Sequence, residues 1–512
     1  MSYFSNVINI TSENSNSYFY NTESSSFLIS HPVMKYIAEM DENENDILKM
    51  IENTENDKIE IPDYYPITAD TLNYYCKKYE ILKNNGYFKK NLHLEEKLTG
   101  ELNSNQIKKS FTNVNNICIE VTEKCNLKCE YCGYGDLYCG YDSNRSNDID
   151  FNKIENLFFH LEKYWISEYN SFSNKVINIG FYGGEPLIEM DTIKKTIDLL
   201  KKYTNRKFIF SMTTNGVLLD KYIEFLVKND FQILISLDGY RYADSYRKFH
   251  DGKESFNGVI KNIFMIKNKY PIYFNKKVSF NSVFTSRSNY SAVVKFFRNN
   301  FNKKFNYQEV TENSLKPDKK KEYYKIFGNS YVNFKENEKY LKNNESVYTD
   351  DPELSALKNF IFKNTEFIIK RFSNLIEESS SGDNNKIERY YPSGTCIPFS
   401  IKLFLTSRGK VLPCERIDFK NHLFQIDNDP FEIDFDKITK MYNDYFKRIK
   451  SLCAKCSKSL KCTKCIFKME FDNNKIICDE FVSVKENSKD LSIYFDLLEK
   501  KPHLYNKTFR KV

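Results

Sequence analysis

The chain has 512 residues, of which 41% are hydrophobic and 28% are charged, and its formal net charge at pH 7 is +7. This length exceeds one ordinary hydrophobic core and predicts about three domains, while the composition excludes a mainly disordered chain. The densest basic stretch, residues 316–325, is interrupted by acidic and aromatic residues. We therefore expect no nucleic-acid partner.

The first fifteen residues have neither the basic region nor the apolar segment of a secretory signal, and no run of about 18 apolar residues follows. We therefore expect a cytoplasmic protein that does not associate with a membrane. The chain has 13 cysteines. Because the cytoplasm keeps thiols reduced, these cysteines indicate metal-binding or catalytic thiols rather than structural disulfides.

Residues 1–95 have the pattern of a small module of strands and helices. A possible hairpin over 17–29 precedes a short helix that begins near Pro32. A longer helix is predicted over 68–84, and the Asn-Gly pair at 85–86 ends it.

From residue 113 to residue 310 the pattern alternates between strand and helix. The predicted strands are 117–121, 176–182, 208–212, 231–236, 278–284 and 305–310. The predicted helices are 151–164, 191–203, 221–228 and 256–267. This alternation predicts an α/β fold with parallel strands joined by right-handed crossovers. The chemistry of such a fold sits in the loops at the carboxyl ends of the strands.

Residues 311–392 are rich in Lys, Glu, Asn and Tyr, and apolar residues over 354–378 recur at helical spacing. We predict a mostly helical connection there. A cysteine-rich domain over 393–485 follows it, and residues 486–512 form a C-terminal helical segment.

The first cysteine group, Cys125, Cys129 and Cys132, lies in the loop directly after the first predicted strand of the alternating region. Three thiolates can ligate three irons of a [4Fe-4S] cluster, which leaves the fourth iron open to another ligand. The alternative is a structural zinc site, which needs four protein ligands. Cys139 is the only nearby candidate for a fourth.

The spacing C-x3-C-x2-C, with the aromatic Tyr131 before its last cysteine, resembles the signature of the radical S-adenosylmethionine (SAM) superfamily. The resemblance implies a partial (β/α)6 TIM-like barrel. It also implies that the open iron binds SAM and that a 5′-deoxyadenosyl radical abstracts a hydrogen from the substrate. Tyr131 would lie against the adenine.

Further motifs follow the next three strands. The sequence Gly-Gly-Glu-Pro at 183–186 resembles the GGEP element of this family, in which the glycines allow close approach of the SAM methionine group. Arg247 stands where related enzymes carry an arginine for the SAM carboxylate, a task that suits a guanidinium. The residues that the resemblance assigns to SAM binding are Tyr131, Gly183, Gly184, Glu185, Thr214, Asn215, Ser236, Asp238 and Arg247.

A second group of seven cysteines occupies residues 396–478, and its spacing resembles the SPASM extension of radical SAM peptide-modifying enzymes. That resemblance implies two auxiliary [4Fe-4S] clusters and therefore three in all. The implied ligands are Cys396, Cys414 and Cys465 for the first auxiliary cluster and Cys453, Cys456, Cys462 and Cys478 for the second. With three cysteines for the first auxiliary cluster, one of its irons is open or is held by another residue. A zinc ribbon built from the four closely spaced cysteines is the alternative.

Enzymes of this kind often begin with a winged-helix-like domain that recognises the precursor peptide, and residues 1–95 have the size and element order for it. Such a domain binds a leader peptide as an added strand; the alternative is a structural cap. The whole chain resembles sactisynthase- and ranthipeptide-type maturases, which join a cysteine sulfur to a carbon within one ribosomally synthesised precursor peptide. The resemblance also implies an electron donor such as flavodoxin or ferredoxin.

Two other enzyme functions fit the same motifs: an anaerobic sulfatase-maturating enzyme, which forms formylglycine, and a peptide cyclase that makes carbon–carbon crosslinks. An iron–sulfur electron-transfer or scaffold protein is the non-enzymatic alternative, and it would need neither the GGEP-like motif nor the motif at 236–239. The sequence identifies no general base.

Overall fold

The structure is a computed structural model of the chain. Its described residues are 7–22, 26–42, 58–62, 64–88, 94–143, 145–171, 176–308, 312, 314–328, 357, 375–376, 389–427, 432–472 and 475–504. The chain divides into two compact units. The first unit comprises residues 1–101, 350–395 and 442–512, and the second comprises residues 102–349 and 396–441.

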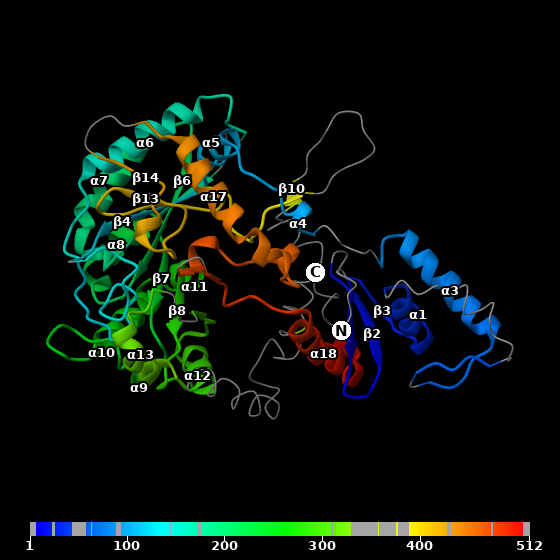
Figure 1. The fold of residues 1–512 in the computed structure, drawn as a ribbon. Helices are drawn as coiled ribbons and strands as arrows, with labels where there is room; N and C mark the ends of the chain where they lie inside the picture. Colours follow the sequence, from blue (N-terminus) through cyan, green and yellow to red (C-terminus); the bar gives the residue numbers. More distant parts are fainter. Residues whose placement is uncertain are drawn as a thin grey trace. The chain divides into compact units, whose positions relative to one another are not determined.

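The second unit is built on a nine-stranded sheet in the order β14-β13-β12-β4-β5-β6-β7-β8-β9 (Figure 1). The six strands from β4 to β9 are parallel and lie side by side in chain order. Their bounds are Asn116–Thr122 (β4), Val176–Gly183 (β5), Lys207–Thr214 (β6), Gln232–Ser236 (β7), Val278–Val283 (β8) and Asn306–Gln308 (β9). The predicted α/β fold with a mostly parallel sheet is therefore confirmed.

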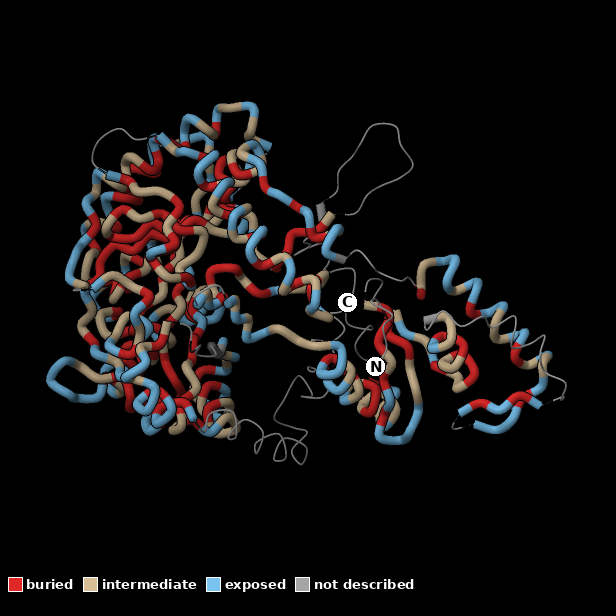
Figure 2. The backbone as a smooth tube through the Cα atoms, in the orientation of Figure 1, coloured by how far each residue is buried: buried red, intermediate tan, exposed pale blue. Residues whose placement is uncertain are grey.

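Helices connect the consecutive parallel strands. They include α6 (Phe151–Trp165), α7 (Met190–Leu200), α8 (Leu219–Lys228), α10 (Phe256–Lys269) and α12 (Tyr290–Phe301). In α6 the residues Ile154, Leu157, Phe158 and Leu161 recur at helical spacing, and all four are fully buried. Asp150 caps the start of α6, since its side chain accepts a hydrogen bond from the Asn152 N–H at 3.0 Å. Figure 2 shows that burial in this unit is concentrated in the strands of the sheet.

Three further strands extend the sheet beyond β4, and the sequence analysis did not predict them. β12 (Leu403–Leu405) pairs parallel with β4, while β13 (Lys410–Leu412) and β14 (Phe424–Gln425) continue antiparallel. The turn between β12 and β13 needs Gly409, because its φ is +88° and a Cβ there would lie 2.1 Å from the carbonyl oxygen of Ile426. Residues 396–441 belong to the second unit and residues 442–485 to the first.

The first unit contains an antiparallel sheet of β1 (Val7–Thr11), β2 (Ser17–Asn21) and β3 (Phe27–Ile29), with helices α1 (Pro32–Glu42) and α3 (Ala69–Asn84). The predicted hairpin and both helices are confirmed, whereas β1 was not predicted. Thr68 caps α3 by accepting a hydrogen bond from the Thr71 N–H at 3.3 Å.

The C-terminal helix α18 (Val484–Lys500) packs on this N-terminal sheet. Its residues Leu491 and Phe495 share a buried cluster with Ile8 and Ile10 of β1, and the Phe495 ring lies 4.5 Å from that of Tyr18. The C-terminal helical segment predicted for residues 486–512 is confirmed over 486–500, and α18 begins at Val484 because Ser483 and Glu486 form a capping box.

Several further α-helices and β-strands occur among the described residues. They are α4 (Leu94–Lys97), α5 (Ser104–Thr112), α9 (Arg241–Asp244), α11 (Pro271–Lys277), α13 (Lys320–Phe327), α17 (Phe435–Ala454), β10 (Leu375–Ile376), β11 (Arg389–Tyr390), β15 (Glu470–Asp472) and β16 (Lys475–Ile477). Most of the helical connection predicted for residues 311–392 lies outside the described residues. Within the described ranges, no helix combines the length and the apolar character needed to cross a bilayer.

We expect Phe495→Ala to weaken the attachment of α18 to β1 by about 3–5 kcal/mol, because it empties a ring-sized space in a packed cluster. The measurement is the opening free energy of the β1 amides by native-state hydrogen exchange. The matched control is Ile493→Ala on the same helix, where the wild-type side chain is 62% exposed. A loss of similar size in both variants would contradict this packing.

Candidate cofactor site

The first cysteine group lies at the carboxyl end of β4, and its three thiols are close enough to influence one another electrostatically. Burial raises the pKa of Cys129, and nearby Cys132 and Cys125 raise it further, while the Arg247 guanidinium lowers it. Burial likewise raises the pKa of Cys125 to about 11. Without a metal these thiols are therefore protonated at neutral pH, and a bound metal would have to displace their protons.

Hydrogen-bond donors face the sulfurs of this group. The Leu127 N–H donates to Cys125 Sγ at 3.4 Å, and Asn215 Nδ2 lies 3.8 Å from the same sulfur. Although burial raises the pKa of Cys132, backbone hydrogen bonds from Tyr134 and Gly135 oppose that increase. Since such donors stabilise thiolates and tune iron–sulfur clusters, the three thiols and their surroundings fit the cluster that the sequence predicts.

The loop that carries the first cysteine group, residues 125–132, is called the cysteine loop. Backbone hydrogen bonds join one side of it to residues 246–250. The Lys128 N–H donates to the Lys248 carbonyl at 2.7 Å, and the Glu130 N–H donates to the Tyr246 carbonyl at 3.1 Å. These backbone bonds hold the loop in a fixed conformation independently of any side chain.

Gly183 and Gly184 bring the end of β5 into direct contact with the start of the cysteine loop. A Cβ on Gly183 would lie 2.2 Å from the carbonyl oxygen of Thr122, and one on Gly184 would lie 2.2 Å from that of Lys124. The sequence analysis explained these glycines by the approach of SAM. The structure gives them a role within the protein, because no side chain fits between the two strands at these positions.

Glu185 braces the ends of two strands from a fully buried position. Its carboxylate accepts hydrogen bonds from Thr214 Oγ1 at 2.7 Å, the Asn215 N–H at 2.7 Å and the Leu187 N–H at 3.1 Å. Three predicted SAM-binding residues, Glu185, Thr214 and Asn215, are thus brought together. In this arrangement the carboxylate already joins the end of β5 to the end of β6.

Asp238, Arg247 and Tyr131 form a second buried polar group beside the cysteines. Arg247 Nε and Nη2 each lie 3.1 Å from an Asp238 carboxylate oxygen, and the Tyr131 hydroxyl donates to the same carboxylate. The Arg247 guanidinium lies 5.5 Å from the centre of the Tyr131 ring. These three predicted SAM-binding residues bind one another, and their contact with SAM stays a prediction.

Ser236, the remaining residue assigned to SAM, ends β7 and pairs in register with Asn281 of β8.

The second cysteine group is divided between the two units. Cys453, Cys456, Cys462 and Cys478 lie in the first unit. Burial raises the pKa of Cys453, and Cys462, Cys456 and Cys478 raise it further, so the four thiols lie within electrostatic range of one another. The Lys464 N–H donates to Cys462 Sγ at 3.4 Å. These four thiols fit the closed four-ligand site that the sequence predicts.

Cys396 and Cys414 belong to the second unit, whereas Cys465 belongs to the first. Burial and the neighbouring Glu415 raise the pKa of Cys414 to about 12, and the Arg416 N–H donates to its sulfur at 3.3 Å. The assignment of these three cysteines to one cluster stays a prediction. In the described part of the chain, no group of three or more His, Cys, Asp or Glu side chains is arranged to hold a single metal ion.

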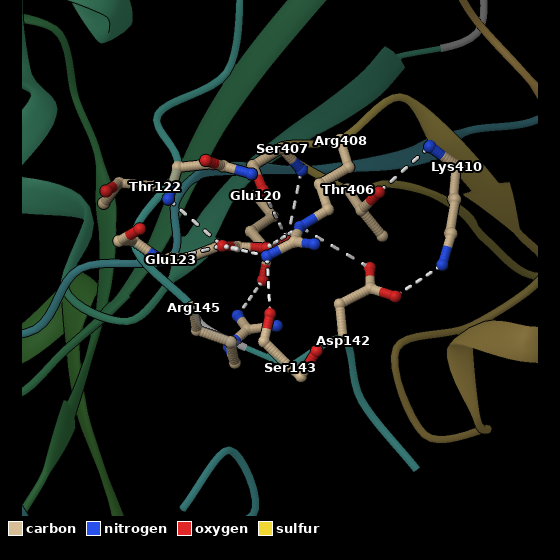
Figure 3. A network of polar contacts seen from close by, with 12 residues as sticks. Glu120, Thr122, Glu123, Asp142, Ser143, Arg145, Thr406, Ser407, Arg408 and Lys410 are labelled. Carbon is tan, nitrogen blue, oxygen red and sulfur yellow. Dashed lines mark hydrogen bonds and ion pairs between the residues drawn. The ribbon is translucent and has the colours of Figure 1, made fainter.

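A network of buried charges flanks the cysteine loop, and the sequence analysis missed it (Figure 3). Glu120 of β4 accepts hydrogen bonds from Arg145 Nη2 and from the N–H and hydroxyl of Ser407, the latter two at 3.0 and 3.2 Å. Glu123 accepts from Arg408 Nε at 2.8 Å and Nη2 at 3.1 Å. The network therefore ties both flanks of the cysteine loop to the turn between β12 and β13.

Comparison with known proteins gives a family match. Residues 119–296 match the model of the radical SAM superfamily. The radical SAM cyclopropyl synthase TigE of Paramaledivibacter caminithermalis is 32% identical over 171 residues, which are 33% of this chain and 34% of TigE. A cysteine-type anaerobic sulfatase-maturating enzyme of Clostridium perfringens is 27% identical over 299 residues, 57% of this chain and 71% of that enzyme.

The chain spans 34% to 48% of the length of the first four curated relatives that it matches. Among solved structures, native anSMEcpe with bound AdoMet and Cp18Cys peptide matches 77% of this chain and 98% of that chain, with 22% sequence identity and a TM-score of 0.47.

We expect Glu185 to make stability depend on pH in the cluster-free protein. Burial raises the pKa of Glu185 to about 7, although hydrogen bonds from Asn215, Thr214 and Leu187 oppose the increase. An acid whose pKa is higher in the folded state stabilises the fold below its unfolded pKa, and this contribution is lost as the pH rises through the folded pKa. The wild type should therefore lose about 3 kcal/mol relative to Glu185→Gln between about pH 4.5 and pH 7.

The measurement is chemical denaturation of both proteins at several pH values across that window. Glu224→Gln, an exposed glutamate on α8, is the control and should follow the wild type. Parallel pH profiles for the wild type and Glu185→Gln would contradict the raised pKa.

Proposed function

We propose that this chain, whose residues 119–296 match the radical SAM superfamily, is a radical SAM enzyme that installs thioether crosslinks, from cysteine sulfur to carbon, in a ribosomally synthesised precursor peptide. The observation that carries the proposal is the group of Cys125, Cys129 and Cys132 at the carboxyl end of β4. The donors that face these sulfurs match a site that holds thiolates.

A [4Fe-4S] cluster on these cysteines, with SAM bound, supplies the 5′-deoxyadenosyl radical. The chain's own residues shape the site around it. Asp238 holds the Arg247 guanidinium in place through two hydrogen bonds at 3.1 Å, and a guanidinium fixed in this way would bind the SAM carboxylate through its remaining donors. Glu185 fixes the Thr214–Asn215 turn, and Asn215 presents its amide to Cys125.

The proposed reaction needs an electron acceptor, and the auxiliary cysteines bear on where it is. Formation of a thioether from a thiol and a C–H group removes two hydrogens, one as an atom taken by the 5′-deoxyadenosyl radical. The thiol proton leaves as H⁺, so one further electron must leave the substrate. We place its acceptor at the auxiliary [4Fe-4S] clusters that these cysteines would hold, and an external carrier such as flavodoxin or ferredoxin would exchange electrons with the enzyme.

The N-terminal sheet supports recognition of a leader peptide. Among the described strands β3 pairs only with β2, so its other edge has no partner strand in the described part of the chain. Ile29 at the end of β3 is 82% exposed and Phe27 is 45% exposed. An open edge strand with exposed apolar side chains suits the addition of a peptide as a further strand.

A second candidate function is anaerobic sulfatase maturation, in which the enzyme oxidises a cysteine or serine of a sulfatase to formylglycine. The match to the sulfatase-maturating enzyme of Clostridium perfringens, which covers 71% of that relative, favours it. Both functions begin with hydrogen abstraction from a peptide, and they differ in the product. A carbon–carbon crosslink is a third product that the same radical chemistry permits.

We expect anaerobic co-expression with a short cysteine-containing peptide encoded beside the gene to give a product that lacks two hydrogens per crosslink. The crosslinked cysteines should no longer react with a thiol-alkylating reagent, because their sulfurs are bonded to carbon. Mass spectrometry before and after alkylation measures both.

The same peptide with its cysteines changed to alanine is the control, and its mass should not change. Loss of two hydrogens with every thiol still free would indicate a carbon–carbon crosslink instead. Loss of sulfur with formation of an aldehyde would indicate formylglycine, and no mass change would contradict the proposed peptide substrate.

We expect Ile29→Asp to weaken leader binding about tenfold, because it places a charge on the open edge of β3. Fluorescence anisotropy with a labelled leader peptide measures the affinity. Tyr65→Asp is the control, since Tyr65 is 81% exposed and lies outside β3. Equal affinities for the wild type and Ile29→Asp would contradict binding at this edge.

A further inference from the structure

Arg145 is a buried cation beside the cysteine loop. Its side chain is 9% exposed, and it donates through Nη2 to Glu120, whose side chain is fully buried. Its guanidinium carbon lies 3.8 Å from the centre of the Tyr134 ring and 5.7 Å from that of Phe419. The guanidinium is therefore fixed by one carboxylate and by stacking on an aromatic ring.

Two N–H groups of the Arg145 guanidinium form no hydrogen bond within the described part of the protein. Nε and Nη1 are both buried, and neither has a hydrogen-bond partner among the described residues. A buried donor without a partner has lost its hydrogen bonds to water and gained none in return, so such groups are rare and need an explanation. The charge and the free donors of Arg145 indicate that it acts on a group absent from the protein chain itself.

The neighbouring cysteine identifies the place where Arg145 acts. Tyr134, on whose ring the guanidinium stacks, also lies two residues after Cys132 and belongs to the same tight turn, in which the Gly135 N–H donates to the Cys132 carbonyl at 2.8 Å. Burial raises the pKa of Cys132. The backbone hydrogen bond from Tyr134 opposes this increase most strongly, and the charge of Arg145 has the next largest opposing effect. Arg145 thus stacks on the ring two residues beyond Cys132, and its charge acts on the Cys132 thiol.

We propose that Arg145 is a positioning residue for the cluster on Cys125, Cys129 and Cys132, and that its buried positive charge beside Cys132 favours the reduced state of that cluster. This inference rests on the proposed function only in requiring a cluster on these three cysteines.

The physical reason is electrostatic. Reduction adds one negative charge to the cluster, and a cation fixed nearby in a region of low dielectric lowers the free energy of that charge. Glu120 opposes the effect in part, because it carries the opposite charge on the far side of the guanidinium. Ser407 fixes Glu120 in turn, through hydrogen bonds of 3.0 and 3.2 Å.

Arg247, a second guanidinium near the cysteines, is held by carboxylates through direct contacts. It forms two hydrogen bonds with Asp238, and its Nε lies 3.5 Å from Asp244. Arg145 has hydrogen-bond contact with one carboxylate among the described residues, Glu120, and Glu123 acts on its charge without a hydrogen bond. Its Nε and Nη1 therefore stay available to another group.

The test is an anaerobic redox titration of the full chain with all its clusters, followed by electron paramagnetic resonance. The signal that changes on addition of SAM reports the cluster on the first cysteine group. We expect Arg145→Met to shift its midpoint so that the ratio of reduced to oxidised cluster falls about tenfold at a fixed potential, which is about 59 mV for a one-electron couple. Arg145→Lys should keep most of the wild-type midpoint, because it keeps the charge.

Two further variants separate charge from structure. Glu120→Gln removes the opposing charge and should shift the midpoint in the opposite direction to Arg145→Met. Lys410→Met removes a cation of the same network that binds Asp142 instead of Glu120 or Glu123, and it should leave the midpoint near the wild-type value.

An unchanged midpoint in Arg145→Met, or shifts of the same sign in Arg145→Met and Glu120→Gln, would overturn the inference. If Arg145→Met does not fold, Glu120→Gln decides alone, and a midpoint that is unchanged or shifted toward the oxidised cluster would overturn the inference. A wild-type protein without a SAM-responsive cluster would instead overturn the proposed function, so the two failures are distinguishable.

Discussion

The site depends on the close approach of two backbones at the carboxyl ends of β4 and β5. The Gly184 N–H donates to the Thr122 carbonyl and the Glu185 N–H to the Lys124 carbonyl, both at 2.9 Å. Because side chains at Gly183 and Gly184 would meet the facing carbonyl oxygens at 2.2 Å, only glycine permits this contact. The contact fixes the start of the loop that carries Cys125, and it carries Glu185 to the position from which it braces β6.

Buried charges surround this contact, and the described contacts pair each of them with an opposite charge or with hydrogen-bond donors. Glu120 binds Arg145, Glu123 binds Arg408 and Asp238 binds Arg247. Since a buried ion pair is costly to break, these pairs hold the cysteine loop in one arrangement more than they add to overall stability. The turn between β12 and β13, which precedes Cys414, takes part through Ser407 and Arg408. The same hydrogen bonds and ion pairs thus connect the surroundings of the first cysteine group to the hairpin that leads to Cys414.

Much of the parallel sheet was predictable because its strands are apolar runs separated by amphipathic helices. The strands of three residues or fewer that extend the sheet, such as β12 and β13, gave no comparable pattern within a cysteine-rich segment. Helix α17 did carry a pattern, since its buried residues Phe435, Ile438, Tyr442, Phe446 and Ile449 recur at helical spacing. The strand β1 was missed because its five residues follow a polar opening.

The cysteines of the candidate site were predictable from the sequence. The ion pairs that surround them were less so. The spacing of the cysteines identified Cys125, Cys129 and Cys132, whereas the pairing of Glu120 with Arg145 joins residues 25 positions apart and left no local pattern. One signal was present, because Glu120 is the charged residue of β4 and stands between the apolar Ile119 and Val121. Such a residue is buried only with a partner, and the partner can be found only from the fold.

The most direct test of the account is whether the first cysteine group alone supports reductive cleavage of SAM. Anaerobically reconstituted protein is incubated with SAM and dithionite, and 5′-deoxyadenosine is quantified together with the iron content. The account predicts 5′-deoxyadenosine from the wild type and none from Cys129→Ala, which should still retain the iron bound by the second cysteine group. Equal cleavage by both proteins, or a wild type that binds iron but produces no 5′-deoxyadenosine, would contradict it.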